Sequence, residues 1–431
     1  MTVDTNASFF TNMALKRGTP PRQPSVCLFG ALDTKGEEYS YVAELLREAG
    51  CGVIVADTGV LGGPRGVADV TREEVARAGG AELSRLKEDA DRGAAMSVMA
   101  AGAANIARRL HQEGKLDAVM GLGGSNAAFV MSAVGAALPV GVPKVLVSTI
   151  VSGDTRSYVG ATDMTLVYPI VDISGLNRIS RKVLANAAAA CAGMALAPGV
   201  GSEADKPVVG ISMFGVTTQC CTAIRDRLAL KEIEPLTFHA TGVGGRSMEA
   251  LIRSGHIQAV ADITTTELAD DLVGGVCSAG PERLTAAASA GVPQVVSLGA
   301  LDMVNFGPPE TVPERFAHRL FHQHNPNVTL MRTSPDECAE LGRRISRKLN
   351  AARGAVAVLV PRRGLSQISV AGQPFYDPAA DEALFESLLS SLRESIEVRE
   401  FDADINDPRI SGAAADLIAG WLERRREMTV T

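Results

Sequence analysis

The sequence predicts an α/β protein made of two duplicated Rossmann-like domains, each built on a parallel sheet. Apolar, β-branched runs alternate with helical stretches along the chain, a pattern typical of parallel strands covered on both faces by helices. Polar, glycine-rich turns follow most of these runs, where the strands of such a sheet would end. The expected strands are 25–30, 52–57, 116–123, 142–149, 207–215, 235–240, 257–263, 293–299 and 355–361.

Internal repetition indicates that the two domains are copies of one unit. Four segments of the first half recur in the same order in the second half. A duplication explains four ordered matches better than chance similarity between strands does. The pairs are VCLFG with ISMFG, VIVADTG with LTFHATG, GKLDAVMGLG with GHIQAVADIT, and GVPKVLVS with GVPQVVS.

The repeat sets the expected domain boundaries. We expect a flexible leader over residues 1–24, an N-terminal Rossmann-like domain over 25–198 and a C-terminal one over 206–431, with APGVGSEADKP as the linker. Residues 377–425 are expected to add a helix, a short strand and a closing helix. Ligands of doubly wound sheets bind beyond the carboxyl ends of the strands. The expected ligand cleft therefore lies at these ends, between the two domains.

Composition and charge exclude several classes of function. Of the 431 residues, 46% are hydrophobic and 21% are charged, as in ordinary globular proteins. The net charge of −7 argues against nucleic-acid binding, which needs a clustered basic surface, and against a membrane role. The apolar run 183–200 is Ala-rich and contains Asn186, so we expect a buried helix there and no membrane span. Such Ala-rich helices favour a homo-oligomer.

Cysteine usage indicates a reducing compartment. The seven cysteines are scattered, and no CxxC pair or zinc-type spacing occurs among them. The N-terminus lacks the basic start and apolar core of a signal peptide. We therefore expect a cytoplasmic protein.

The loop after the first strand, ALDTKGEE, holds the first candidate ligand residues. Asp33 and Thr34 open the next helix, and Lys35 brings a cation to its first turn, where the helix dipole disfavours it unless an anion lies nearby. Thr34-x-x-Glu37 is also a capping-box pattern, so a purely structural role stays open. The chain contains no GxxxxGKS or GxxxxGKT sequence. A nucleotide site would therefore differ from a P-loop.

An acid and an insertion follow the second strand. Asp57 stands where dinucleotide-binding folds hold a ribose hydroxyl, but no GxGxxG precedes it, so an NAD site is disfavoured. Residues 61–93 are a charged insertion that the second copy lacks. Thr71-x-x-Glu74 predicts that a helix starts within it. The insertion is either a lid or a solvated surface helix.

The turn GLGGSN after the third strand is the strongest phosphate-binding candidate. Gly123 and Gly124 permit close approach of the backbone to a ligand, and Ser125 or Asn126 can cap the next helix. Backbone N–H groups at a helix N-terminus favour an anion. A plain strand-to-helix turn is the structural alternative.

The loops after the two fourth strands contain the candidate metal ligands. The first has Ser152, Gly153, Asp154 and Thr155, and the second has Asp302. Carboxylates beside phosphate-binding turns commonly hold Mg²⁺. We therefore expect Asp154 and Asp302 to contribute to a magnesium site.

The second copy offers two further candidate turns. HATGVGGRS contributes Gly242, Gly244, Gly245 and Arg246, which form either a phosphate loop or a plain turn. DITTTELADD contributes Thr264, Thr265, Thr266 and Glu267, which suit a sugar or a metal-bound phosphate and also match a capping box.

The sequence offers no identifiable nucleophile or zinc site. No GxSxG elbow occurs in the chain. His322 and His324 are spaced for a strand rather than for a metal-binding helix, and no third ligand has a suitable spacing.

Several long motifs carry a family resemblance. They are LDTKGEE, GLGGSN, VSTIVSGDT, DISGLNRIS, MFGVTT, FHATGVGGRSMEAL, TTTELADDLVGGV, SAGPERL, GALDMVNFGPP, HNPNVTLMRT and INDP. From about residue 24 to its end, the chain resembles the uncharacterised bacterial family related to the N-terminal ATP-binding domain of the tomato mosaic virus resistance protein. The resemblance implies two Rossmann-like domains that bind ATP or Mg-ATP. Related domains occur fused to a TIM barrel of the phosphoenolpyruvate hydrolase type, so such a barrel could act as a separate partner.

Two hypotheses for function stay open. The first is an ATP-binding enzyme acting on a small metabolite, in which Lys35, Arg156, Arg178 and Arg246 offset phosphate charge and Asp33 acts as a metal or acid–base group. The second is a nucleotide-gated binding protein that regulates a partner without catalysis. No residue can be assigned a catalytic role from the sequence.

Overall fold

The computed structural model describes residues 22–89, 91–197 and 206–430. Apart from residues 22–24, the predicted leader lies outside the described residues, as does most of the predicted linker. The chain divides into two compact units, Met1–Gly199 (unit 1) and Val200–Thr431 (unit 2).

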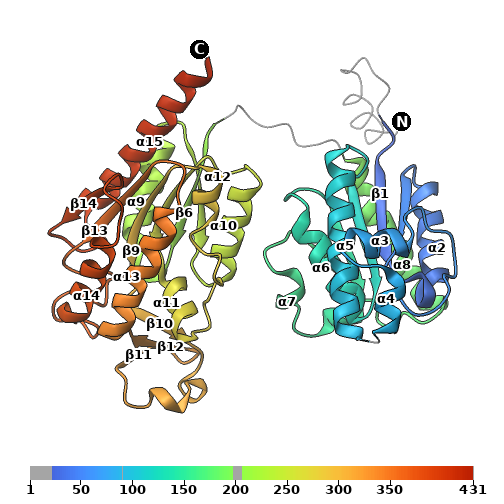
Figure 1. The fold of residues 1–431 in the computed structure, drawn as a ribbon, viewed down its shortest axis with the longest axis horizontal. Coiled ribbons are helices and arrows are strands. Elements are labelled where there is room, and N and C mark those ends of the chain that lie inside the picture. Colours follow the sequence, from blue (N-terminus) through green and yellow to red (C-terminus); the bar gives the residue numbers. More distant parts are fainter. Residues whose placement is uncertain (1–21, 90, 198–205, 431) are drawn as a thin grey trace, which may run out of the picture. The chain divides into compact units, whose positions relative to one another are not determined.

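Unit 1 is built on a five-stranded sheet in which all pairings are parallel (Figure 1). The strand order is β2-β1-β3-β4-β5, so the chain changes direction across the sheet between β1 and β3, the topological switch point of a doubly wound fold. Its elements are β1 (Ser25–Gly30), α2 (Leu32–Glu48), β2 (Gly52–Asp57), α3 (Arg72–Ala78), α4 (Leu83–Glu88), α5 (Arg92–Gln112), β3 (Ala118–Gly123), α6 (Ser125–Ala137), β4 (Lys144–Ser148), η1 (Thr149–Ser152), α7 (Arg156–Val159), β5 (Thr165–Val167) and α8 (Arg178–Leu196).

Helices cover both faces of this sheet. Apolar residues of α2 and α8 form a buried cluster on one face, with Leu46 and Leu184 among its members. Residues of α3, α4, α5 and α6 form the cluster on the other face, which includes Met99 and Val130. The central strand β3 is buried along its whole length, because both of its faces are covered.

Unit 2 repeats this plan and extends it. Its six-stranded parallel sheet has the order β14-β13-β9-β8-β6-β7. The segment β7-β6-β8-β9 matches β2-β1-β3-β4 of unit 1, which agrees with the predicted duplication. Its elements are β6 (Val208–Met213), η2 (Gly215–Thr217), α9 (Thr218–Ala229), β7 (Glu234–His239), α10 (Val243–Arg253), β8 (Ala259–Thr264), α11 (Thr266–Val273), α12 (Ala286–Ala290), β9 (Gln294–Gly299), β10 (Met303–Phe306), η3 (Pro309–Thr311), η4 (Glu314–Phe316), β11 (Phe321–Asn325), β12 (Val328–Arg332), α13 (Pro335–Asn350), β13 (Val356–Pro361), α14 (Pro378–Leu389), β14 (Glu397–Phe401) and α15 (Pro408–Val430).

The predicted fold class is confirmed, with one addition. Both main sheets are parallel, and α9 and α15 cover one face of the second sheet while α10 to α14 cover the other. A small antiparallel sheet, β10-β12-β11, also forms in unit 2 between β9 and α13. Its strands are short and β11 is largely polar, so the apolar pattern that identified the other strands was absent.

Candidate functional site

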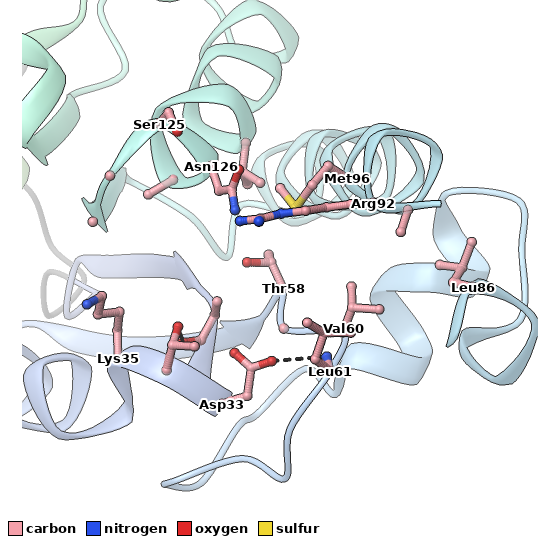
Figure 2. Close-up of a pocket in the computed structure, with 18 of the residues that line it drawn as sticks. Asp33, Lys35, Thr58, Val60, Leu61, Leu86, Arg92, Met96, Ser125 and Asn126 are labelled. Atoms are coloured by element: carbon pink, nitrogen blue, oxygen red, sulfur yellow. Dashed lines mark hydrogen bonds between the residues drawn. The ribbon is translucent and has the colours of Figure 1, made fainter. Parts of the chain in front are cut away.

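A cavity of about 620 Å³ lies at the carboxyl ends of β1, β2 and β3 in unit 1 (Figure 2). Its walls are the loops that follow these three strands, together with residues of α4 and the first turns of α5. The cavity therefore lies at the topological switch point between β1 and β3, where ligands of doubly wound folds bind.

The GLGGSN turn forms one end of this cavity. Gly123 has a φ of +143°, which only glycine adopts readily, and Gly124 is the N-cap residue of α6 with no side-chain capping bond. The predicted capping by Ser125 or Asn126 is wrong, because α6 already begins at Ser125. The first backbone N–H groups of this helix consequently lack a side-chain cap at the cavity wall.

Three basic residues line the cavity: Lys35, Lys87 and Arg92. Lys35 interrupts the helical backbone of α2, and its Nζ donates to the carbonyl oxygen of Ile173. Figure 2 shows Arg92 reaching from α5 across the cavity toward Asn126. Arg92 makes no side-chain hydrogen bond or ion pair with the residues that the structure describes.

Asp33 is held at the floor of the cavity by the loop after β2. The residue is 9% exposed, and its Oδ2 accepts hydrogen bonds from the N–H groups of Leu61 (3.1 Å) and Gly62 (3.2 Å). The predicted capping box at Thr34 is wrong, because Ala31 is the N-cap of α2. Thr34 is exposed and also lines the cavity.

Asp57 has a structural role instead of the ribose-binding role considered from the sequence. Its Oδ1 accepts from the N–H groups of Leu32 (3.0 Å) and Gly59 (2.8 Å), and Arg72 pairs with it at 3.3 Å. Burial raises the pKa of Asp57, while these hydrogen bonds and Arg72 oppose the increase. The side chain is 2% exposed and both of its oxygens have partners within the protein.

The loop after β4 does not contribute to the cavity wall. Asp154 is exposed and pairs with Arg156 at 2.6 Å, and the hydrogen bond from Arg156 lowers its pKa to about 2. The Ser152 hydroxyl donates to the carbonyl oxygen of Thr149, at 3.1 Å. Ser152, Gly153, Asp154 and Thr155 are thus separate from the residues that line the cavity.

The GVGG turn of unit 2 binds a carboxylate of the protein itself. Oε1 of Glu267 accepts from the N–H groups of Gly242 (2.7 Å) and Gly245 (3.0 Å), at the start of α10. A Cβ on Gly244 would lie 1.9 Å from the carbonyl oxygen of His239, so this glycine serves close packing. Arg246 donates to the carbonyl oxygen of Ser278.

A buried arginine neutralises Glu267. The Arg283 guanidinium, 1% exposed, donates to Glu267 at 2.6 Å and also pairs with Asp262 and Glu249. Sequence analysis quotes Arg283 only within the SAGPERL motif and gives it no role, because the motif does not show that three carboxylates surround the guanidinium. In unit 2 an internal carboxylate therefore occupies a position at which an anionic ligand could bind a helix N-terminus.

The threonines after β8 are fully buried and hydrogen-bonded inside unit 2. Thr264 bonds to Thr217 (2.7 Å), Thr265 to the carbonyl of Ser297 (3.1 Å) and Thr266 to that of Met303 (3.5 Å). The predicted capping box over Thr264–Glu267 is wrong, because α11 begins at Thr266.

Asp302 is also buried, so it is not presented at a surface. Its Oδ2 accepts from the Ser366 hydroxyl at 2.8 Å, and burial raises its pKa while Arg332 opposes the increase. Among residues 22–89, 91–197 and 206–430, no group of three or more His, Cys, Asp or Glu side chains is arranged to hold a metal ion.

The structure thus brings one part of the predicted site together. Asp33, Thr34, Lys35 and the Gly123–Asn126 turn share the cavity of unit 1. Sequence analysis missed the other walls, among them Thr58, Leu86, Arg92 and Met96. The predicted insertion over residues 61–93 supplies two of these, Leu86 and Arg92, but its sequence pattern does not show which of its residues face the cavity.

The helices of the described ranges include none with the length and apolarity needed to span a membrane.

Comparisons with known proteins identify relatives of this chain. The N-terminal domain of the uncharacterised protein family UPF0261 matches residues 24–199, and the C-terminal domain of that family matches residues 206–422. A UPF0261 protein of Clostridium tetani is 45% identical over 93% of this chain and 99% of its own length. Another, from Rhizobium meliloti, is 44% identical over 90% of this chain and 97% of its own length. The ToMV resistance protein Tm-1 of Solanum lycopersicum is 43% identical over 75% of this chain, which matches 44% of the tomato protein.

Proposed function

The chain belongs to the uncharacterised protein family UPF0261. On the basis of this membership and of the cavity in unit 1, we propose that the chain is an ATP-binding protein. The predicted family resemblance, including the relation to the tomato resistance protein, is confirmed. Nucleotide binding itself is our proposal. The observation that carries it is the helix N-terminus of α6, which opens without a side-chain cap onto a cavity at the switch point of the sheet.

The phosphates of the nucleotide would bind at the α6 end of the cavity. Backbone N–H groups at a helix N-terminus, together with the helix dipole, favour an anion. Arg92 lies in the first turn of α5, where the dipole of its own helix disfavours a cation unless an anion is close. It approaches the α6 end from the opposite wall (Figure 2), so a phosphate between them would interact with both.

The base would bind at the apolar end. Val60, Leu86, Ala95, Met96 and Val130 line the cavity beside the polar turn. Binding sites for small molecules are predominantly apolar with a few placed polar groups, and typically measure about 300–1,000 Å³. The volume of about 620 Å³ falls in this range. A ligand with one planar apolar part and one anionic part fits this division.

Replacing Gly124 with valine tests the proposal. Gly124 has a φ of −88°, and no atom lies within 4 Å of a Cβ placed there, so the Gly124→Val variant should fold. The added side chain would occupy the space that a phosphate needs to reach the N–H groups of α6. We expect calorimetric titration with Mg-ATP to show binding to the wild-type protein and at least about tenfold weaker binding to the variant.

Gly153→Val is the matched control. Gly153 follows the neighbouring strand β4, has a similar backbone conformation (φ −121°, ψ −154°) and lies outside the cavity wall. This variant should bind ATP like the wild type. Equal binding by the Gly124→Val variant would reject the α6 site, and no binding by the wild type would reject the ATP proposal.

We also propose that nucleotide binding serves a cytoplasmic enzyme acting on a small carboxylated or phosphorylated metabolite, with a TIM-barrel protein as a separate partner. The family resemblance supports this proposal, and so do the polar residues in the cavity walls, which could bind a second polar ligand. Release of phosphate from ATP should then depend on a small-molecule fraction of a cell extract. No turnover with any fraction would leave nucleotide-gated regulation as the function of the site.

A further inference from the structure

The floor of the unit 1 cavity contains a carboxylate that no basic group neutralises. Only one oxygen of Asp33, Oδ2, is bound by the N–H groups of Leu61 and Gly62. Its Oδ1 has no hydrogen bond to the residues that the structure describes, and Asp33 forms no ion pair with them. Lys35, two residues away, donates instead to the carbonyl oxygen of Ile173, and Arg72 pairs with Asp57.

Thr58 lines the same cavity as Asp33. The residue is 5% exposed, and its hydroxyl makes no hydrogen bond with any described residue. Figure 2 shows this hydroxyl directed into the cavity from the loop after β2, between Asp33 and Arg92. The hydroxyl oxygen is not among the buried side-chain atoms that lack a partner, so it is accessible from the cavity. With no protein partner, it can offer its oxygen to a ligand bound there.

Carboxylates as well as basic residues line the cavity: Asp33, Asp91 and Asp172. If phosphates bind at the α6 end, the Asp33 carboxylate would face them as a like charge in a confined space, which is unfavourable. A divalent cation removes this conflict, because it attracts both groups. Magnesium takes oxygen ligands, and it commonly bridges one or two protein oxygens to the phosphates of a nucleotide while retaining water.

We propose that Asp33 and Thr58 bind a divalent cation, Mg²⁺, that bridges the protein to the phosphates of the nucleotide. The inference rests on the proposed nucleotide site, and it assigns the metal to residues other than Asp154 and Asp302. Asp33 supplies the charge through its free oxygen, and Thr58 supplies a neutral oxygen. The N–H groups of Leu61 and Gly62 hold the carboxylate in place and thereby orient it.

Titrations with and without metal test this assignment. ATP is titrated calorimetrically into each protein in excess Mg²⁺ and again in excess EDTA. For the wild type we expect Mg²⁺ to strengthen ATP binding about tenfold or more. Asp33→Asn should lose most of this gain. It should also bind metal-free ATP at least as tightly as the wild type does, because the repulsion between carboxylate and phosphate is gone.

A folding control and two further variants, Thr58→Val and Asp154→Asn, distinguish metal binding by Asp33 from a general loss of structure. The amide oxygen of Asp33→Asn can still accept from Leu61 and Gly62, so a wild-type thermal midpoint should show that the loop is intact. Thr58→Val keeps the side-chain shape and should lose a smaller part of the magnesium gain. Asp154→Asn, on the exposed loop after β4, should behave like the wild type.

Each remaining outcome contradicts a specific part of the argument. An unchanged magnesium gain in both Asp33→Asn and Thr58→Val would overturn the metal site and leave ATP binding intact. Equal weakening of ATP binding in both buffers would mean that Asp33 binds the nucleotide directly, as through a ribose hydroxyl. No ATP binding by the wild type in either buffer would overturn the proposed function and this inference together.

Discussion

Asp270, in the middle of α11, is a buried carboxylate whose protonation should affect the stability of unit 2. It is fully buried and accepts hydrogen bonds from the N–H of Cys277 (2.9 Å) and from the side-chain amide of Asn305 (2.7 Å). Burial raises its pKa from 3.8 to about 7, the hydrogen bonds oppose the increase, and the charge of Glu267 adds to it.

This pKa predicts a loss of stability as pH rises. The pKa of Asp270 is higher in the folded state, so its contribution is complete below pH 3.8 and is lost as pH rises through about 7. We expect the free energy of unfolding of unit 2 to fall by roughly 1–3 kcal/mol between about pH 5 and about pH 7, where the unfolded state is ionised at this position and the folded state is still protonated, and to level off above that range. The Asp270→Asn variant should lack this part of the pH dependence. Urea unfolding of both proteins, followed by Trp421 fluorescence, measures it.

Comparing the pH dependence of the wild type and of Asp270→Asn can also contradict this prediction, and the variant is expected to fold. Equal pH slopes for the wild type and for Asp270→Asn would show that Asp270 stays ionised in the folded protein. The variant should fold, because the amide oxygen of Asn305 has no partner within the described structure. Turning that amide would provide the acceptor that the new side-chain N–H requires.

Single residues also show how far the site could be predicted from the sequence. Strand ends locate polar residues near one edge of the sheet, and Asp33, Lys35 and Gly124 do meet in one cavity. The same rule could not exclude Asp154, because a pattern does not show which way a loop turns. It also could not show that Glu267 is neutralised by Arg283, which follows it by 16 residues, because the SAGPERL motif does not reveal which carboxylates its arginine meets.

At the scale of elements, the insertion between β2 and β3 is a packed wall of the cavity. Helices α3 and α5 cross at very short range, since a Cβ on Gly102 would lie 1.9 Å from the carbonyl oxygen of Val75. The Cβ of a residue replacing Gly79 would lie 2.1 Å from the carbonyl oxygen of Val98. The two helices therefore meet backbone to backbone. The first turns of α5 then present Arg92 and Met96 to the cavity.

This crossing predicts a strong effect from one added methyl group. Gly102→Ala would force α3 and α5 apart, and we expect it to destabilise unit 1 by roughly 2–4 kcal/mol. Gly193→Ala, in α8 of the same unit, is the control because no atom lies within 4 Å of its Cβ. It should stabilise by about 0.5–1 kcal/mol through helix propensity alone. Thermal unfolding followed by circular dichroism compares the two. A similar midpoint for both variants would contradict the close crossing.

Long apolar elements were predictable and short or polar ones were not. All nine strands predicted from apolar runs are present, and so is the capping box that starts α3 at Thr71. Strand β5 has three residues, and β11 contains His322, Gln323 and His324, so neither has an apolar run. Their pairing comes from contacts with β4 and β12. Such long-range contacts are not recorded in a local pattern.

At the scale of the whole molecule, duplication has left two copies with different interiors. Both units keep the same order for their first four strands. In unit 1 the helix after the third strand begins at a cavity with no side-chain cap. In unit 2 the residues at that position, Thr264 to Glu267, are fully buried and bonded internally. We therefore propose that unit 1 binds the nucleotide and that unit 2 is stabilised by its own network of polar side chains.

This division predicts that ATP stabilises one unit and leaves the other unchanged. Each unit has buried apolar clusters of its own, so we expect each unit to unfold in its own transition. A ligand that binds only the folded form of unit 1 raises its midpoint, by about 5–10 °C at a hundredfold excess over Kd. The midpoint of unit 2 should not move.

The position of the single tryptophan makes this measurable in the intact chain. Trp421, on α15, packs against a buried cluster of unit 2, so its fluorescence reports the unfolding of that unit. Scanning calorimetry detects both transitions. The transition of unit 1 is the one that calorimetry detects and Trp421 fluorescence does not. Mg-ATP should raise the midpoint of this transition, and Gly124→Val should abolish that increase. A shift of the Trp421 transition instead would place the nucleotide in unit 2, and equal shifts of both would show that the units unfold as one.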